Sequence, residues 1–502
     1  MTANAPTNSG YWTDSGNYAT SFAGGSGTST DPYLISTPQQ LARLAYLINN
    51  SSTNSQYASL YYKQTANLDM SAYWWDAIGY YDSNYSYLSF RGNYLGEGYN
   101  ISNLYVSGSD GNCAGLFGYT VDAVICDINI EDLTLGIYYN GYNGGISAYS
   151  LRSTFKSCNV LGEISGYDSQ YVGGLVGYAN DSTFSNCSNN SNIDYTGGRS
   201  SNVGGIAGYI SATLIENCYN LGKITYSDIY GQEDYSTYVG GITGASRSDS
   251  IIQKSYNIGN ISGYLQVGGI TGNSSSASIY DCYNRGEITG YNMVGGIAGS
   301  DNGLCICTCY NTGEIICTSN WSVSSQQVAG IAGFSNGEIY NCINVGTRNI
   351  IGYNSTESGC EVYNSYIDST GLNCKDINYF TSTSNWSSKH YWDFEETWSI
   401  VPSMNDGYPI LVAGIVVTIT YHPNGASGDE VVESKVGNAS YTIRSNMFTR
   451  SGYNFTGWNT QANGGGTSYS AGSSYSSLAN LDLYAQWSRI TYTIKYNKNA
   501  SD

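Results

Sequence analysis

The sequence predicts an all-β fold in which a parallel β-solenoid is followed by a smaller β-repeat module. Three observations lead to this prediction. A glycine pair recurs along most of the chain, a cysteine recurs at a fixed distance after it, and no repeat carries the 3.6-residue apolar stripe of an amphipathic helix.

The first repeated feature is a glycine pair followed by an apolar residue. Successive copies start 27 to 36 residues apart. The copies begin at Gly144, Gly173, Gly204, Gly240, Gly268 and Gly295, with a degenerate copy at Ala329 and an early relative at Gly115. A period of this length is typical of solenoid proteins.

The second feature is a cysteine that follows the first glycine by 14 residues. These cysteines are Cys158, Cys187, Cys218, Cys282 and Cys309, while Cys342 follows its copy by 13 residues and Ser255 takes the place at 15. An apolar residue stands three positions before each one, as Phe155 does before Cys158. Because an odd separation breaks the two-residue alternation of a straight strand, we expect a bend between the two.

Each repeat is predicted to form three short strands divided by turns, with Gly and Asn supplying the positive φ that tight corners need. Such a unit cannot bury its apolar face alone, so the units are expected to stack as coils ~4.8 Å apart. Equivalent residues would then form ladders, cysteine on cysteine, Tyr on Tyr and Asn on Asn. Parallel crossover connections are nearly always right-handed, which predicts a right-handed β-helix.

The ladders bear on the 13 cysteines of the chain. Cysteine behaves as a small buried apolar residue, and a ladder position suits one small residue repeated. A structural ladder is therefore predicted in preference to a disulfide framework, with some stacked disulfides as the open alternative.

Composition and charge exclude several partners. The net charge is −19, the opposite of what phosphate binding by a basic patch requires, so nucleic acid and anionic membranes are not expected partners. The sequence holds no apolar run of ~20 residues, so no membrane insertion is expected. The first residues carry no signal peptide pattern, and the chain ends just after a strand-like run, which predicts a fragment of a longer surface chain.

The glycine-pair copies, such as Gly295-Gly296-Ile297-Ala298-Gly299, resemble the GLUG motif of bacterial surface adhesins and secreted peptidases. The sequences on either side resemble the ends of such domains. Gly25-Ser26-Gly27-Thr28 resembles the opening, and Gly407-Tyr408-Pro409-Ile410-Leu411 resembles the close. The resemblance covers residues 24–414 as a solenoid domain, after a leader or linker at 1–23. The stretch from Gln39 to Asn49 has helical apolar spacing and is expected to form a short capping helix.

From about Ile415 the character of the sequence changes. A strand-like Thr418-to-Tyr421 run is followed by Gly452-to-Trp458, a glycine loop at Gly464-to-Gly466, and Leu483-to-Trp487. This pattern is similar to the internalin-type B-repeat, also called the Listeria–Bacteroides repeat. The resemblance implies a small β-grasp-like domain at 415–488 on an extracellular bacterial protein. Residues 489–502, with the strand-like Tyr492-to-Asn497, are predicted to start a second, truncated copy.

No catalytic constellation emerges from the sequence. The two histidines, His390 and His422, fall in different predicted domains and are expected to be structural or surface residues. Cys305, Cys307 and Cys309 occupy every second position, so a strand would place them on one face, where Cys317 could join them. Zinc ligation by these thiolates is an alternative to their structural role.

The acidic residues scattered over the solenoid cannot be paired from the sequence as a glycosidase would require; they are Asp181, Asp194, Asp228, Glu233, Asp234 and Asp249. Catalytic, cofactor and metal sites are therefore all predicted to be absent.

Aromatic residues carry the remaining functional signal. The runs Tyr73-Trp74-Trp75, Tyr80-Tyr81 and Tyr138-Tyr139 could stack on sugar rings or anchor a protein partner. The tyrosines that follow the repeat are instead expected to stack inside the structure; they are Tyr219, Tyr256, Tyr283 and Tyr310.

These expectations combine into an extracellular, cell-surface or secreted bacterial protein. It is predicted to be a non-catalytic adhesin-like or display protein that binds a host or matrix glycan or protein. Two alternatives stay open, the non-catalytic region of a secreted peptidase and a carbohydrate-active β-helix enzyme. The function is what the family resemblance implies, whereas the fold follows from the repeat pattern.

Overall fold

The computed structural model describes residues 5–81, 87–107, 113–138, 141–197, 201–228, 237–319, 327–345, 350–354, 362–363, 366–368, 392–394, 397–400, 409–412, 415–437 and 440–495. The chain divides into two compact units, residues 1–392 and 393–502. Each unit has its own hydrophobic core, one running from Trp12 to Ile350 and the other from Ile415 to Ala485. The finer boundaries at 23/24, 414/415 and 488/489 stay predictions.

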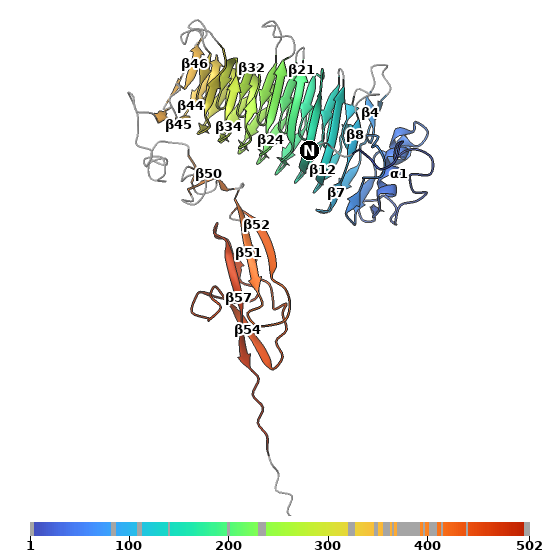
Figure 1. Ribbon diagram of the computed structural model, residues 1–502, viewed down its shortest axis with the longest axis vertical. Helices are drawn as coiled ribbons and strands as arrows, with labels where there is room; N and C mark the ends of the chain where they lie inside the picture. Colours follow the sequence, from blue (N-terminus) through green and yellow to red (C-terminus); the bar gives the residue numbers. More distant parts are fainter. Residues whose placement is uncertain are drawn as a thin grey trace, which may run out of the picture. The chain divides into compact units, whose positions relative to one another are not determined.

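The first unit is a parallel β-solenoid of about nine turns over residues 33–344 (Figure 1). One coil illustrates the pattern, and its strands are β17 (Tyr171–Gly173), β18 (Val176–Asn180), β19 (Thr183–Ser185), β20 (Ser188–Asn189) and β21 (Asn192–Gly197). Each strand pairs in parallel with its equivalent in the next coil. The expectation of three strands per repeat is therefore wrong, because extra corners cut the coils from β17 to β41 (Ile315–Cys317) into five shorter strands each.

Left-handed residues form two of these corners. Asp181, with φ of 51°, separates β18 from β19, and Asn186, with φ of 54°, separates β19 from β20. The second corner lies between Phe184 and Cys187, so the predicted bend between the apolar residue and the cysteine is confirmed. Equivalent residues at this corner in other coils are Ser157, Asn217, Lys254, Asp281, Thr308 and Asn341.

The paired glycines are explained by close packing between coils. Neither Gly173 nor Gly174 has a positive φ, so these glycines are not required by a left-handed corner. A Cβ at Gly174 would instead lie 2.5 Å from the side-chain oxygen of Asn189, and closer still to the carbonyl oxygen of Gly205 in the next coil. The pair is therefore required because there is no space for a side chain, and not because of the backbone conformation.

The third glycine of the motif has the same explanation. Gly208 lies on β23 (Ala207–Ser211), where a Cβ would meet the backbone nitrogen of Val172 on β17 at 2.7 Å. The strand after the glycine pair thus packs on the strand before it, one coil back, with no room for a side chain. All three glycines of the motif are required by close backbone packing.

Ladders of identical residues fill the interior, as predicted. Cys158, Cys187, Cys218, Cys282 and Cys309 are fully buried and unbridged, and Ser255 occupies the same kind of buried position. From Cys187 onward, the asparagine two residues after the cysteine or serine forms part of a continuous hydrogen-bonded row: Asn189, Asn220, Asn257, Asn284, Asn311 and Asn344. The interior is therefore organised by side-chain ladders that run along the solenoid.

A helical cap covers the first coil, as the sequence predicted. Helix α1 (Pro38–Asn49) starts after Thr37, whose hydroxyl accepts a hydrogen bond from the Gln40 backbone nitrogen at 3.4 Å, and it buries Leu41, Leu44 and Ile48. A second short helix, α2 (Asn54–Tyr57), follows it. The segment before residue 24 also contributes, because Trp12 is buried and its indole nitrogen donates to the Met70 carbonyl at 3.2 Å.

The second unit contains a small mixed β-sheet. Its strands lie in the order β52 (Val431–Val436), β51 (Val416–His422), β57 (Leu481–Arg489), β54 (Tyr453–Asn459) and β55 (Ser468–Tyr469). The β51–β57 pair is parallel and the others are antiparallel. Residues 491–495, where a further strand was predicted, lie in no strand; Tyr496 and Asn497 fall outside the described residues.

Candidate functional site

Five tyrosines lie together on the outside of the solenoid, and we call them the tyrosine face: Tyr142, Tyr149, Tyr171, Tyr178 and Tyr209. All five are half-buried. Tyr149, Tyr178 and Tyr209 stand on equivalent positions of three successive coils and stack with ring centroids 4.8 and 4.9 Å apart. They form one row of the face.

The second row consists of Tyr142 and Tyr171, from β13 (Tyr142–Gly144) and β17. Their rings are parallel at 5.1 Å. They meet the first row edge to face, with Tyr171 lying 5.2 Å from Tyr178 at 81°. The two rows therefore form a herringbone pattern, in which each ring is held by its neighbours.

This packing determines what the face can offer a ligand. Stacking within a row occupies the flat faces of the inner rings, so a ligand would reach mainly ring edges and the phenol groups. Burial raises the pKa of Tyr178 to about 12, which keeps this phenol protonated near neutral pH. The face is thus a rigid, uncharged surface that combines apolar carbon with polar hydroxyl groups.

The face ends where the tyrosine repeat ends. Tyr209 aligns with Ala245 in the next coil, and Tyr171 aligns with Asn202. Tyr149, Tyr178 and Tyr209 each follow the first glycine of their copy by five residues, a regularity in the sequence that could have identified the row. The tyrosines predicted to stack, Tyr219 to Tyr310, belong to a different repeat position, so this row was not predicted.

The aromatic residues singled out from the sequence lie elsewhere. Trp75 is buried, with its indole nitrogen bonded to the Leu116 carbonyl at 3.0 Å, and Tyr73 packs on Trp12 at 5.1 Å. Both contacts hold the cap together. Tyr80 is 37% exposed, whereas Tyr139 lies outside the described residues.

The repeat tyrosines stack along the solenoid, as predicted. Tyr219, Tyr256, Tyr283 and Tyr310 have neighbouring ring centroids 4.8 to 5.0 Å apart and ring planes within 7° of parallel. Tyr283 and Tyr310 are almost completely buried. This row is architectural.

Cys305, Cys307 and Cys309 do not share one face, so that expectation is wrong. Strand β39 (Cys305–Cys307) ends at Thr308, whose φ of 51° turns the chain, and Cys309 is buried while the other two are partly exposed. Among the residues the structure describes, no three His, Cys, Asp or Glu side chains are arranged to hold a metal ion. Burial raises the pKa of the Cys309 thiol well above its usual range.

The acidic residues noted in the solenoid occupy separate structural positions. Asp181 and Asp249 adopt left-handed conformations at corners of different coils. Asp194 is exposed on β21, and Asp228 ends β26 (Ile224–Asp228). Glu233 and Asp234 lie outside the described residues.

His422, at the end of β51, is more constrained than an ordinary surface histidine. Its Nδ1 lies 2.6 Å from Glu430 and its Nε2 lies 2.9 Å from Asp482, and its ring stacks on Tyr484 at 4.3 Å. Burial lowers the pKa of His422, but the hydrogen bonds with Asp482 and Glu430 outweigh it and raise the pKa overall. The carboxylates lie at opposite ring nitrogens, which makes the group an ion-pair bridge. His390 lies outside the described residues.

A pH dependence follows from this bridge. A histidine whose pKa is raised by folding stabilises the fold fully below its unfolded pKa of about 6.5, and the stabilisation is lost as pH rises through the folded pKa. We expect His422→Gln to lower the urea midpoint of the second unit more at acidic than at alkaline pH. Equal decreases in the urea midpoint at both pH values would contradict the ion-pair bridge. An NMR titration, assigned with His390→Gln, should place the His422 pKa above the usual value.

Comparison with known proteins identifies segments of the chain. The GLUG motif profile matches residues 168–194 and 199–225, and the Listeria-Bacteroides repeat domain profile matches residues 418–486. The chain therefore contains GLUG motif repeats and a C-terminal Listeria-Bacteroides repeat domain.

A distant relative comes from Evansella cellulosilytica and is named "Putative Gly-rich membrane protein". The two are 30% identical over 122 residues, which are 22% of this chain and 13% of the relative. No solved structure gives a significant match. In the part of the chain that the structure describes, no helix has the length and apolar character needed to cross a membrane.

Proposed function

We propose that the chain is a non-catalytic, adhesin-like or display protein that binds a host or matrix glycan or protein through the tyrosine face. The observation that carries the proposal is the packing of five half-exposed tyrosines across three coils. Aromatic side chains with a polar tip are enriched at binding interfaces because they bury a large apolar area and also form hydrogen bonds. Rings held by their neighbours lose little further entropy on binding.

An extracellular or cell-surface location belongs to the same proposal. The Listeria-Bacteroides repeat domain supports a surface protein, and the name of the relative points to a membrane-associated chain. Because this chain spans only 13% of that relative, the support concerns only the 122 matched residues.

Two features of the fold are also proposed. The solenoid is right-handed, in keeping with the general rule for parallel crossovers. The repeat domain is β-grasp-like, as the resemblance to the B-repeat implies.

The non-catalytic character remains part of the proposal. The described acidic residues noted in the solenoid hold separate corners or strand positions, which supports display in preference to glycoside cleavage. The region of a secreted peptidase outside its catalytic domain would have the same appearance, and only the full gene would distinguish it.

A binding assay with a triple variant tests the proposal. The full chain is applied to a glycan array and a panel of matrix proteins, with product analysis of every glycan that binds. We expect Tyr149→Ser combined with Tyr178→Ser and Tyr209→Ser to weaken binding at least about tenfold, because interface anchors of this kind contribute more than 1 kcal/mol each.

The matched control removes exposed side chains outside the face. Tyr99, Leu161 and Leu221 are 39%, 47% and 44% exposed, and replacing all three by serine should leave binding unchanged. Released product would reject the non-catalytic assignment. If the triple variant bound as well as the wild type, the tyrosine face would be rejected as the binding site. If the wild-type chain bound nothing, a structural spacer would be the better account of the protein.

A further inference from the structure

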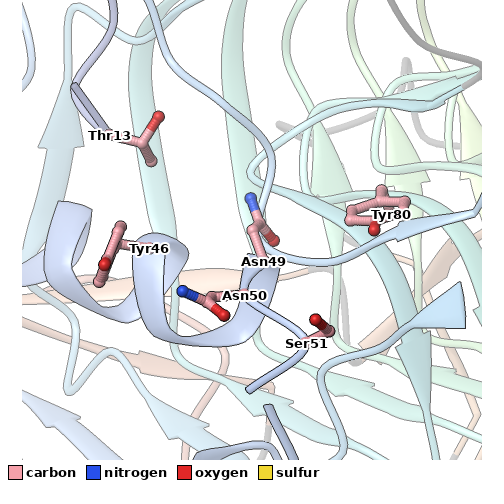
Figure 2. A pocket seen from close by; sticks show the side chains of 6 residues that line it. All are labelled: Thr13, Tyr46, Asn49, Asn50, Ser51 and Tyr80. Atoms are coloured by element: carbon pink, nitrogen blue, oxygen red, sulfur yellow. The ribbon is translucent and has the colours of Figure 1, made fainter. Parts of the chain in front are cut away.

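A separate pocket opens at the capped end of the solenoid (Figure 2). It encloses about 410 Å³, a size within the usual range of small-ligand sites. Six residues from three distant segments line it: Thr13, Tyr46, Asn49, Asn50, Ser51 and Tyr80. Thr13 comes from the N-terminal segment, Tyr46 to Ser51 from the end of α1 and the residues after it, and Tyr80 from β4 (Tyr80–Tyr81).

The lining is fixed by contacts behind the pocket. Asn49 donates from Nδ2 to the Ala77 carbonyl at 2.9 Å, and its Oδ1 accepts from the Gly79 nitrogen at 2.7 Å. Tyr46 stacks on Tyr18 with ring centroids 4.3 Å apart. These contacts tie the helix end to the strand segment before Tyr80, so the site exists before any ligand arrives.

The groups that face the pocket are polar and uncharged. Asn50 uses its Oδ1 to accept from the backbone nitrogen and hydroxyl of Ser52, at 3.0 and 2.7 Å, which directs its amide nitrogen elsewhere. Figure 2 shows the amide of Asn50 on the same side as Tyr46, with the Ser51 hydroxyl and the Tyr80 ring across from it. Amide and hydroxyl groups of this kind donate and accept hydrogen bonds.

Charge around the pocket selects against anions. No lysine or arginine is among the six lining residues, whereas Thr13 donates from its hydroxyl to Asp76. Burial, together with the nearby Asp14 carboxylate, raises the pKa of Asp76 to about 6, so this carboxyl group is mainly ionised at neutral pH. The Asp76 carboxylate beside Thr13 therefore disfavours phosphate, sulfate and uronic acid groups at this edge of the pocket.

We propose that this pocket binds one unit of a neutral glycan, with its hydroxyl groups on the Asn50 amide and Ser51 hydroxyl and its C–H groups against a tyrosine ring. The negative face of an aromatic ring attracts polarised C–H groups, and tyrosine adds a hydroxyl at the ring's edge. The site is distinct from the tyrosine face and does not depend on it.

The test uses the full chain and defined monosaccharide probes. Saturation-transfer NMR and calorimetry are run with methyl glucopyranoside, methyl galactopyranoside, methyl mannopyranoside and N-acetylglucosamine, and with glucuronate as the charged probe. At least one neutral probe is expected to bind saturably, and Tyr80→Ala and Asn50→Ala should each weaken it at least about tenfold.

Two control variants show whether the probe binds in this pocket. Tyr99, 39% exposed, matches Tyr80 at 37% but lies outside the pocket lining, so Tyr99→Ala should bind the probe like the wild type. The triple variant of the tyrosine face should also retain binding, so failure here and failure of the proposed function are distinguishable. The proposal is overturned if no neutral probe binds, if glucuronate is preferred, or if Tyr80→Ala and Asn50→Ala bind normally.

Discussion

Gly241→Ala is expected to destabilise the solenoid by at least about 3 kcal/mol, more than most single substitutions, because the new methyl group has no space to occupy. It would lie 2.5 Å from Cγ of Asn257 within the same coil, and closer still to the carbonyl oxygen of Gly269 in the next coil. Neither neighbour can move easily, since the Asn257 amide is hydrogen-bonded on both sides and Gly269 belongs to the backbone. The coils would have to separate, which breaks their strand pairing. A guanidinium titration followed by circular dichroism measures the loss.

The control for this substitution is Gly98→Ala. Gly98 has a φ of 76° and no atom within 4 Å of a new Cβ, so alanine there carries only the conformational cost of about 1–2 kcal/mol. Gly241 has no positive φ, so its cost is steric alone. A Gly241→Ala chain that is no less stable than Gly98→Ala would contradict close packing as the reason for the glycine pair.

The sequence was sufficient to predict how the repeats stack. Once coils are stacked in register, a residue at a fixed distance from the glycine pair must lie over its equivalent, so the rows of Cys218, Tyr219 and Asn220 followed from spacing alone. The capping helix was also predictable, because Leu41, Leu44 and Ile48 recur at helical intervals and are buried in the structure.

The internal shape of a coil could not be predicted in the same way. Corners at Asp181 and Asn186 depend on single residues in left-handed conformations, and lysine, threonine or serine takes that role in other coils. Residue type is therefore a poor guide to these corners. Glycine is needed at Gly174 because the backbone of the next coil leaves no space for a side chain. This close approach can be recognised only when the two coils are placed together.

The candidate sites differ in how far the sequence anticipates them. The row of Tyr149, Tyr178 and Tyr209 follows the repeat and could have been found by spacing, although the herringbone contact with Tyr171 could not. The pocket at the cap combines Thr13, the end of α1 and Tyr80, which share no repeat position. Only the folded chain brings these residues together.

A substitution in the asparagine row should destabilise the solenoid as much as one in the glycine pair, and Asn257→Ala tests this expectation. Asn257 is fully buried, accepts from Asn220 Nδ2 at 2.7 Å, and donates from its own Nδ2 to Asn284 Oδ1 at 2.8 Å and to the Gly259 carbonyl at 2.7 Å. Alanine removes all three bonds: Asn284 Oδ1 and the Gly259 carbonyl lose these donors, and Asn220 Nδ2 keeps only its bond to the Gly222 carbonyl. At about 1–3 kcal/mol for each unpaired group, we expect a loss of at least about 3 kcal/mol in the free energy of unfolding.

Two further variants show whether hydrogen bonding is the cause. Asn260 lies in the same coil but is exposed, and its side chain accepts one hydrogen bond from Glu287 at 3.1 Å, so Asn260→Ala should cost less than about 1 kcal/mol because water can replace that bond. Asn257→Asp keeps the shape of the side chain but removes the amide donor, and its oxygens would face Asn284 Oδ1 and the Gly259 carbonyl. It should therefore be at least as damaging as Asn257→Ala. If Asn257→Asp were instead as stable as the wild type at neutral pH, shape and not the continuous amide row would determine the interior of the solenoid. Hydrogen exchange would locate the damage, which should be greatest in the coils on either side of Asn257 because each coil contacts only its neighbours.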